Sequence, residues 1–97
     1  MAYRVIWSSK AVEDVDAIAT YIARDSPSYA AAVVRQILDA THQLKENPLT
    51  GEIIVEGDDL TVRDQLAYTY RVIYRVDKEK VIVVAVVHTK RLLDLNE

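Results

Sequence analysis

Two groups of residues in the second half of the chain could do chemistry. The first consists of arginines on predicted strands, namely Arg63, Arg71 and Arg75. The second gathers where a long apolar run ends, and it consists of His88, Lys90 and Arg91. Guanidinium and ammonium groups bind phosphate and carboxylate, and an unperturbed histidine changes charge near neutral pH. Both groups therefore predict a surface for a phosphate-bearing or acidic partner.

One chemistry that such residues could perform is metal-free cleavage of RNA. It needs a base for the 2′-hydroxyl proton, positive charge for the phosphorane, and an acid for the leaving oxygen. The candidates are His88 as acid or base, Glu52 or Glu56 as base, Tyr68 as proton donor, and Arg63, Arg71 and Arg91 as positive groups.

The same residues also fit structural roles. Arginines on an alternating strand most often form a solvated face or bind a partner's carboxylates, and a histidine ending a buried strand is more often structural. We therefore interpret His88 first as structural, and both interpretations stay open for Arg63. The chain has no cysteine, and His42 and His88 form no ligand spacing, so neither a metal site nor a cofactor is expected.

A long β-hairpin near the end of the chain would position these groups. Residues 68–76 alternate between an apolar side and a side that holds Arg71 and Arg75. Residues 81–88 begin with seven apolar positions, mostly β-branched, which is typical of a central strand buried on both sides. A four-residue charged loop, residues 77–80, is expected to join the two strands.

The earlier part of the chain predicts a strand followed by two helices. Residues 3–8 alternate as a strand does, and apolar residues three or four apart predict helices from 10 to about 25 and from 27 to about 46. Serines before each helix suit the N-cap position. Further strands are expected at 52–56 and 60–66.

This order, β-α-α-β-β-β(-β), predicts an α+β fold, with an antiparallel helical hairpin packed on one face of a mostly antiparallel twisted sheet. Residues 1–97 fit a single domain. Since Arg63, Arg71 and Arg75 fall on the polar sides of their own strands, the pattern also predicts that the opposite face of the sheet is open and basic.

The charge is unevenly distributed. The net charge is −3. Residues 1–60 hold five Lys/Arg and ten Asp/Glu, whereas residues 61–97 hold seven Lys/Arg and five Asp/Glu. This balance argues against a non-specific nucleic-acid binder. The sequence shows no signal peptide and no apolar stretch of membrane-spanning length, so we expect a cytoplasmic protein with no membrane partner.

Several short motifs occur together in a fixed order. They are YRVIWSSKAVEDVDAI at 3–18, YIAR at 21–24, LKENPLTG at 44–51, VR at 62–63, YRVIY at 70–74 and VVHTKR at 86–91. In order and spacing they resemble the RelE/ParE superfamily of bacterial toxins, which are encoded beside an antitoxin in type II toxin–antitoxin (plasmid stabilisation) modules.

The resemblance implies a small toxin that is neutralised by a cognate antitoxin in a heterotetramer. The superfamily has two branches: RelE-like members cut mRNA in the ribosomal A site, and ParE-like members poison DNA gyrase. The long helical hairpin resembles the ParE branch, and the acidic net charge favours a protein target. A ParE-like toxin acting on gyrase is therefore the first hypothesis.

The alternative is a RelE-like, ribosome-dependent mRNA endoribonuclease. The resemblance then implies that Arg63, His88 and Arg91 are catalytic or contact RNA. A second alternative is a non-toxic module that only binds an antitoxin. Under the first hypothesis the protein is not an enzyme, and the residues expected to bind target or antitoxin are Arg63, Arg71, Arg75, Lys90 and Arg91.

Overall fold

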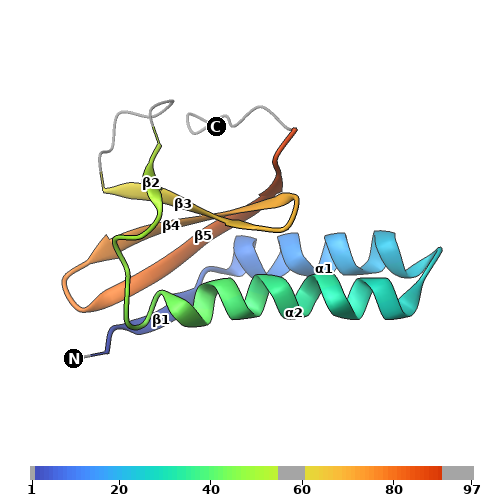
Figure 1. Ribbon diagram of the computed structural model, residues 1–97, viewed down its shortest axis with the longest axis horizontal. Helices are drawn as coiled ribbons and strands as arrows, with labels where there is room; N and C mark the ends of the chain where they lie inside the picture. The colour runs from blue at the N-terminus through green and yellow to red at the C-terminus, as the bar shows by residue number, and fades with distance from the viewer. Residues whose placement is uncertain (1, 55–60, 91–97) are drawn as a thin grey trace.

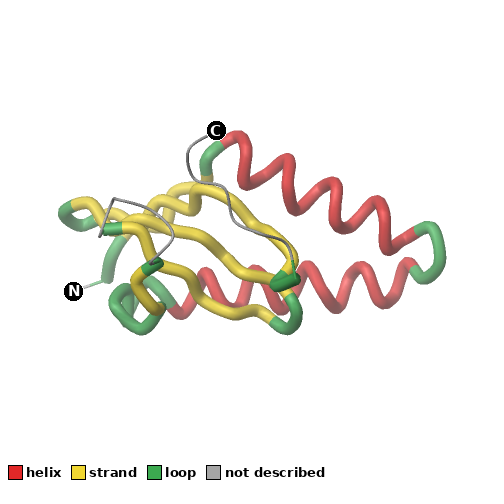
Figure 2. The backbone as a smooth tube through the Cα atoms, turned by 90° about the horizontal axis from the view of Figure 1, so that it is seen from above, coloured by secondary structure: helices red, strands yellow, loops and turns green. Residues whose placement is uncertain are grey.

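The computed structural model describes residues 2–54 and 61–90, in which two helices lie on one face of a five-stranded sheet (Figures 1 and 2). This confirms the predicted α+β arrangement. Both views show the helical hairpin extending past the end of the sheet. In chain order the elements are β1 (Arg4–Trp7), α1 (Ser9–Ala23), α2 (Pro27–Gln43), β2 (Glu52–Ile53), β3 (Val62–Ala67), β4 (Tyr70–Asp77) and β5 (Lys80–His88).

Both helices begin at serine caps, as the sequence predicts. The Ser8 Oγ accepts a hydrogen bond from the Ala11 amide at 3.0 Å, and the Ser26 Oγ accepts one from the Tyr29 amide at 3.1 Å. Each serine satisfies an amide that has no partner within the first turn of its helix. The Ser8 hydroxyl also donates to the Val84 carbonyl at 3.0 Å, which fixes the start of α1 beside β5.

The strands lie in the order β1-β5-β4-β3-β2. β1 runs parallel to β5, and every other neighbouring pair is antiparallel. Because β1 is short, it pairs only with residues 80–83 of β5. A bulge between Ile73 and Tyr74 shifts the register of β4 against β5, and such bulges increase the local twist of a sheet.

The β3–β4 hairpin and the β4–β5 hairpin each turn through two residues. Tyr68 and Thr69 join β3 to β4, and residues 78–79 join β4 to β5. The predicted four-residue loop at 77–80 is therefore too long, since Asp77 and Lys80 are the last paired residues of their strands. Opposite charges placed across a ladder stabilise it, which explains why two charged residues continue the strands here.

The main core lies between the sheet and the helices. Val72, Val83 and Val86 from the sheet pack with Val33 and Ile37 of α2 in one buried cluster. Complete burial of each such side chain contributes about 1.5–3 kcal/mol relative to exposure. The apolar side of β4 therefore faces the helices, as its alternation indicates.

The opposite face of the sheet differs from the prediction. It holds a second buried cluster, formed by Ile54, Ile73 and Ala85, so it is not an open basic face. The three arginines also do not share a side. Residues paired across antiparallel strands point the same way, so Arg63, which is paired with Tyr74, lies on the helix side, whereas Arg71 and Arg75 lie on the other side.

Neither helix is long and apolar enough to cross a membrane, within the residues that the structure describes. The predicted strands at 52–56 and 60–66 lie partly within residues 55–60, which are outside the described residues.

Candidate functional site

Arg63 stabilises the loop that follows α2. Its Nη1 donates hydrogen bonds to the Gly51 carbonyl at 2.8 Å and to the Leu49 carbonyl at 3.3 Å. Hydrogen bonds from a charged donor are stronger than neutral ones. These contacts are typical of a structural role, whereas the catalytic or binding role of Arg63 stays a prediction.

Tyr74, which is fully buried, is hydrogen-bonded to the same loop. Its hydroxyl donates to the Pro48 carbonyl at 2.7 Å and accepts from the Gly51 amide at 3.0 Å. Burial raises the pKa of the Tyr74 hydroxyl, while the Gly51 amide and the Arg63 charge act in the opposite direction. A β-carbon on Gly51 would lie 2.5 Å from the Tyr74 hydroxyl, so only glycine fits there. We call Tyr74, Arg63 and this loop the clasp.

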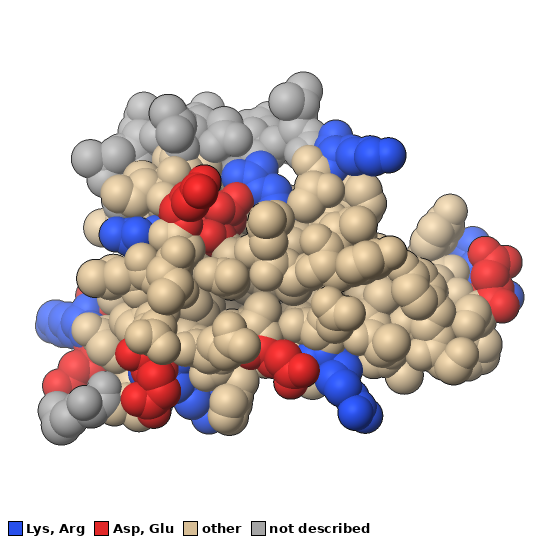
Figure 3. Space-filling view, viewed as in Figure 1, with Lys and Arg blue, Asp and Glu red and all other residues tan. Residues whose placement is uncertain are grey.

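Arg71 lies on the opposite face of the sheet and forms an ion pair with Asp64. Both side chains are 16% exposed, so the pair is largely shielded from solvent. Arg75 is exposed on the same face, and Glu52 lies opposite Asp64 in the register of β2 and β3. Positive and negative side chains are interspersed over the surface seen in Figure 3, without one large basic area.

His88 is the last residue of β5 and is partly buried. Its Nδ1 accepts a hydrogen bond from the Lys90 amide at 3.1 Å, so the neutral ring carries its proton on Nε2. The ring meets Tyr70 edge to face, with the centroids 5.4 Å apart. Lys90 is exposed. Arg91 and Glu56 lie outside the described residues.

The structure does not bring Arg63 and His88 together. Both lie on the helix side, but Arg63 is paired with Tyr74 and His88 with Tyr70. The backbones of Arg63 and His88 are about 16 Å apart, because the two residues are separated by four residues along the strands and by two strand spacings across the sheet. Within the described chain, no three His, Asp or Glu side chains gather where they could hold a metal ion.

An apolar groove runs between α1 and α2, with a volume of about 380 Å³. It exposes Val12 and Leu38, at 54% and 49% of their surface. Val12 lies outside the apolar stripe Ala11, Val15, Ile18 and Ile22 of α1, so the periodicity of the sequence does not identify it. The lining residues are Trp7, Val12, Val15, Asp16, Ala19, Val34 and Leu38.

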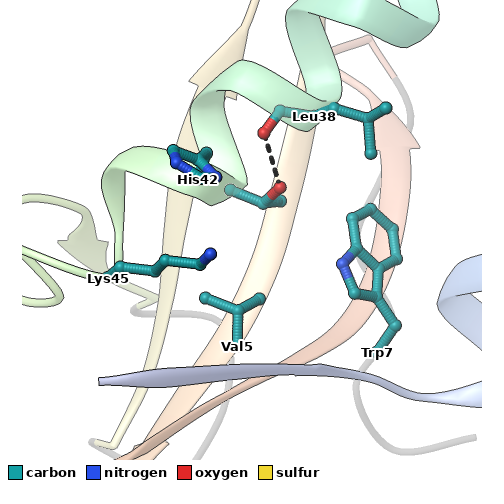
Figure 4. Close-up of a pocket in the computed structure, with 6 residues that line it drawn as sticks. Val5, Trp7, Leu38, His42 and Lys45 are labelled. Carbon is teal, nitrogen blue, oxygen red and sulfur yellow. Dashed lines mark hydrogen bonds between the residues drawn. The ribbon is translucent and has the colours of Figure 1, made fainter. Parts of the chain in front are cut away.

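A second hollow continues this groove toward β1, since Trp7 and Leu38 line both. Figure 4 shows Val5 and Trp7 on β1, facing Leu38 and His42 of α2 and Lys45, which lies just after the end of α2. The floor is thus apolar, and two basic side chains border one end. Such a surface fits the apolar side of an amphipathic helix.

Comparison with solved structures supports the fold. A structure titled "Chromosomal ParDE TA system from P. aeruginosa" matches at 20% identity with a TM-score of 0.75, covering 92% of this chain and 98% of that one. The toxin–antitoxin complex RelBE2 from Mycobacterium tuberculosis matches at 22% identity with a TM-score of 0.65, covering 91% of this chain and 99% of that one. The archaeal RelE–RelB complex from Pyrococcus horikoshii OT3 matches at 22% identity with a TM-score of 0.66, covering 95% of this chain and 100% of that one.

No curated protein matches the chain. The family model described as "ParE toxin of type II toxin-antitoxin system, parDE" matches residues 5–93, which is nearly the whole sequence. That span includes both helices, strands β2 to β5, all of β1 except Arg4, and the residues that line the groove between the helices. The chain therefore belongs to the ParE toxin family of type II toxin–antitoxin systems.

Proposed function

We propose that this toxin acts by binding a protein target, with DNA gyrase the leading candidate, and not by cutting mRNA. The observation that carries the proposal is the position of Arg63. Its guanidinium is engaged by two loop carbonyls and lies far from His88. A nuclease would need these groups around one phosphate. The net charge of −3 further disfavours a ribosomal RNA surface.

We further propose that a cognate antitoxin neutralises the toxin by laying an amphipathic helix in the groove between α1 and α2. The apolar lining supports a helix-in-groove contact, in which anchors at i, i+3, i+4 and i+7 face the floor. The similar structures described above include toxin–antitoxin complexes. We expect the complex to be a cytoplasmic heterotetramer of toxin and antitoxin.

Two assays on purified toxin test the target. Gyrase supercoiling and DNA-cleavage assays should show inhibition, and translating ribosomes should show no codon-dependent mRNA cleavage. His88→Ala should leave growth arrest unchanged, because His88 has no catalytic role in the proposal. Ribosomal mRNA cleavage that disappears in Arg63→Ala, while its melting curve still shows a folded protein, would establish the nuclease instead.

Cells test whether the protein is toxic at all. Expression without the antitoxin should stop growth, and co-expression of the antitoxin from the adjacent gene should restore it. Normal growth without the antitoxin would indicate a module that only binds its partner.

A further inference from the structure

The groove proposed for the antitoxin ends at positively charged side chains. Along α2 it runs from Val34 past Leu38, and the second hollow continues it to Lys45, just after the end of the helix. Lys45 follows Val34 by eleven residues, so the whole path is about 16 Å long. The hollow at the Lys45 end has a volume of about 360 Å³, and its polar lining residues are Thr41, His42 and Lys45. A helix that fills the groove would therefore end beside these groups.

The fold itself does not use the charges of Lys45 and His42. Within the described part of the chain, neither side chain forms an ion pair or a hydrogen bond. The carbonyls of residues 41–43, at the end of α2, do not compete for them, because they accept hydrogen bonds from the backbone amides that follow. The Lys45 carbonyl accepts one from the Tyr3 amide at 2.8 Å, which fixes the backbone beside β1. Both side chains are thus available to a partner.

Lys45 directs its charge into the hollow. It is half-buried, and Figure 4 shows its ammonium end above Val5, on the same side of the hollow as the His42 ring. The Thr41 hydroxyl donates its proton to the Leu38 carbonyl at 2.8 Å, so it is not available to a partner. The hollow therefore offers an ammonium group and an N–H of the imidazole, which the ring keeps in either protonation state. Two such donors suit a carboxylate.

The other end of the groove carries the opposite charge. Asp16 of α1 is exposed and lines the groove together with Ala19 and Val34. α1 leads away from β1, whereas Lys45 lies beside it, so Asp16 and Lys45 are at opposite ends of the path (Figure 1). A helix has a partial positive charge at its N-terminal end and a partial negative charge at its C-terminal end. An antitoxin helix therefore fits best with its N-terminal end at Asp16 and its C-terminal end at Lys45.

We propose that Lys45 and His42 form a carboxylate-binding subsite, which recognises an acidic side chain of the antitoxin one helical turn after its last apolar anchor. The inference rests on the proposed helix-in-groove contact. Anchors at i, i+3 or i+4, and i+7 cover the floor from Val34 to Thr41, and an acidic residue at about i+10 or i+11 then reaches Lys45. An antitoxin with a neutral or basic residue at that position would cover Lys45 without neutralising it, so the subsite discriminates between antitoxins.

Calorimetry with the antitoxin encoded by the adjacent gene tests the subsite. Lys45→Gln should weaken binding about fivefold and Lys45→Glu about twentyfold, whereas Lys45→Arg keeps the charge and should stay within about threefold of the wild type. His42→Ala should weaken binding about twofold. Lys78→Gln is the control, because it removes the same charge at the β4–β5 turn, which lines neither hollow, and it should leave the affinity unchanged. All variants should melt at the wild-type temperature.

A double-mutant cycle locates the acidic residue of the antitoxin. Each Asp and Glu of its groove-binding helix is replaced by Asn or Gln, and binding is measured to the wild-type toxin and to Lys45→Gln. The replacement three or four residues after the last apolar anchor should weaken binding to the wild type, but about threefold less to Lys45→Gln. The inference is wrong if no acidic residue is coupled to Lys45, or if the coupled residue precedes the first anchor.

Leu38→Asp separates this inference from the proposed groove. If Leu38→Asp weakens binding and Lys45→Gln does not, the antitoxin occupies the groove and the carboxylate subsite is refuted. If neither variant weakens binding, the antitoxin binds elsewhere and both proposals are refuted. Lys45→Gln should still arrest growth when the antitoxin is absent. Loss of growth arrest would assign Lys45 to the target, and a wild-type dimer that Lys45→Glu dissociates would assign it to a second copy; either result would overturn the inference.

Discussion

Replacing Tyr74 with phenylalanine should destabilise the toxin by about 2–4 kcal/mol. The ring itself would fit as before, because only the hydroxyl is removed. That hydroxyl is the hydrogen-bond partner of the Gly51 amide and the Pro48 carbonyl, and both hydrogen bonds are buried. Leaving a buried polar group without a partner costs about 1–3 kcal/mol, and the substitution does so to two groups that the loop holds in place.

Urea and thermal unfolding would measure this loss. For a chain of 97 residues, a loss of 2 kcal/mol lowers Tm by roughly 8–16 °C. Tyr70→Phe is the matched control, since Tyr70 lies on the same side of β4 and its hydroxyl has no hydrogen bond within the described residues; its effect should stay below about 0.5 kcal/mol. If the two variants unfolded at the same temperature, the Tyr74 hydroxyl would not hold the loop, and the clasp would be the wrong explanation of this region.

Three further predictions concern the clasp and the groove. Gly51→Ala should lower the free energy of unfolding in urea by about 1–3 kcal/mol, because the added methyl group would lie 2.5 Å from the Asp64 carbonyl oxygen. A variant as stable as the wild type would show that this close contact does not form. Burial raises the pKa of the Tyr74 hydroxyl in the folded protein, so the unfolded chain releases this proton at a lower pH than the folded chain does. The contribution of the hydroxyl to the free energy of unfolding is therefore complete below a pH of about 10 and is lost as the pH rises toward the folded-state pKa. The stability difference between wild type and Tyr74→Phe should therefore narrow in alkaline urea titrations, and a widening difference would show the opposite sign. Leu38→Asp should weaken antitoxin binding at least a hundredfold in calorimetry, since it would bury a carboxylate in an apolar groove, whereas Leu49→Asp, at an exposed leucine outside the groove, should have little effect.

The parts of the fold that depend on local chemistry were predictable from the sequence. Ser26 followed by proline marks the start of α2, because an N-cap side chain and a fixed φ act within one turn. The alternation of β4 identified its buried side, and the apolar run of β5 identified a strand buried on both faces. Each of these signals is complete within a few neighbouring residues.

The side of the sheet on which Arg63 lies was not predictable in the same way. Alternation within β3 separates two sides, but it does not say which of them faces the helices. That depends on the register, which pairs Arg63 with Tyr74 across the ladder. The groove was also harder to see, because Val12 is exposed and falls outside the apolar stripe of α1. If β3 were paired with β4 one residue further along, every side chain of β3 would lie on the opposite face of the sheet.

The contacts of the arginine side chains help to distinguish an RNA target from a protein target. Residues 61–97 carry a net charge of +2 by count, but two of their seven cations are turned toward the protein itself. Arg63 binds the carbonyls of the clasp, and Arg71 is paired with Asp64 in a largely shielded site. Phosphate binding depends on cations that a polyanion can reach. The positive charge that an RNA could reach is thus smaller than the composition indicates, which favours a protein target.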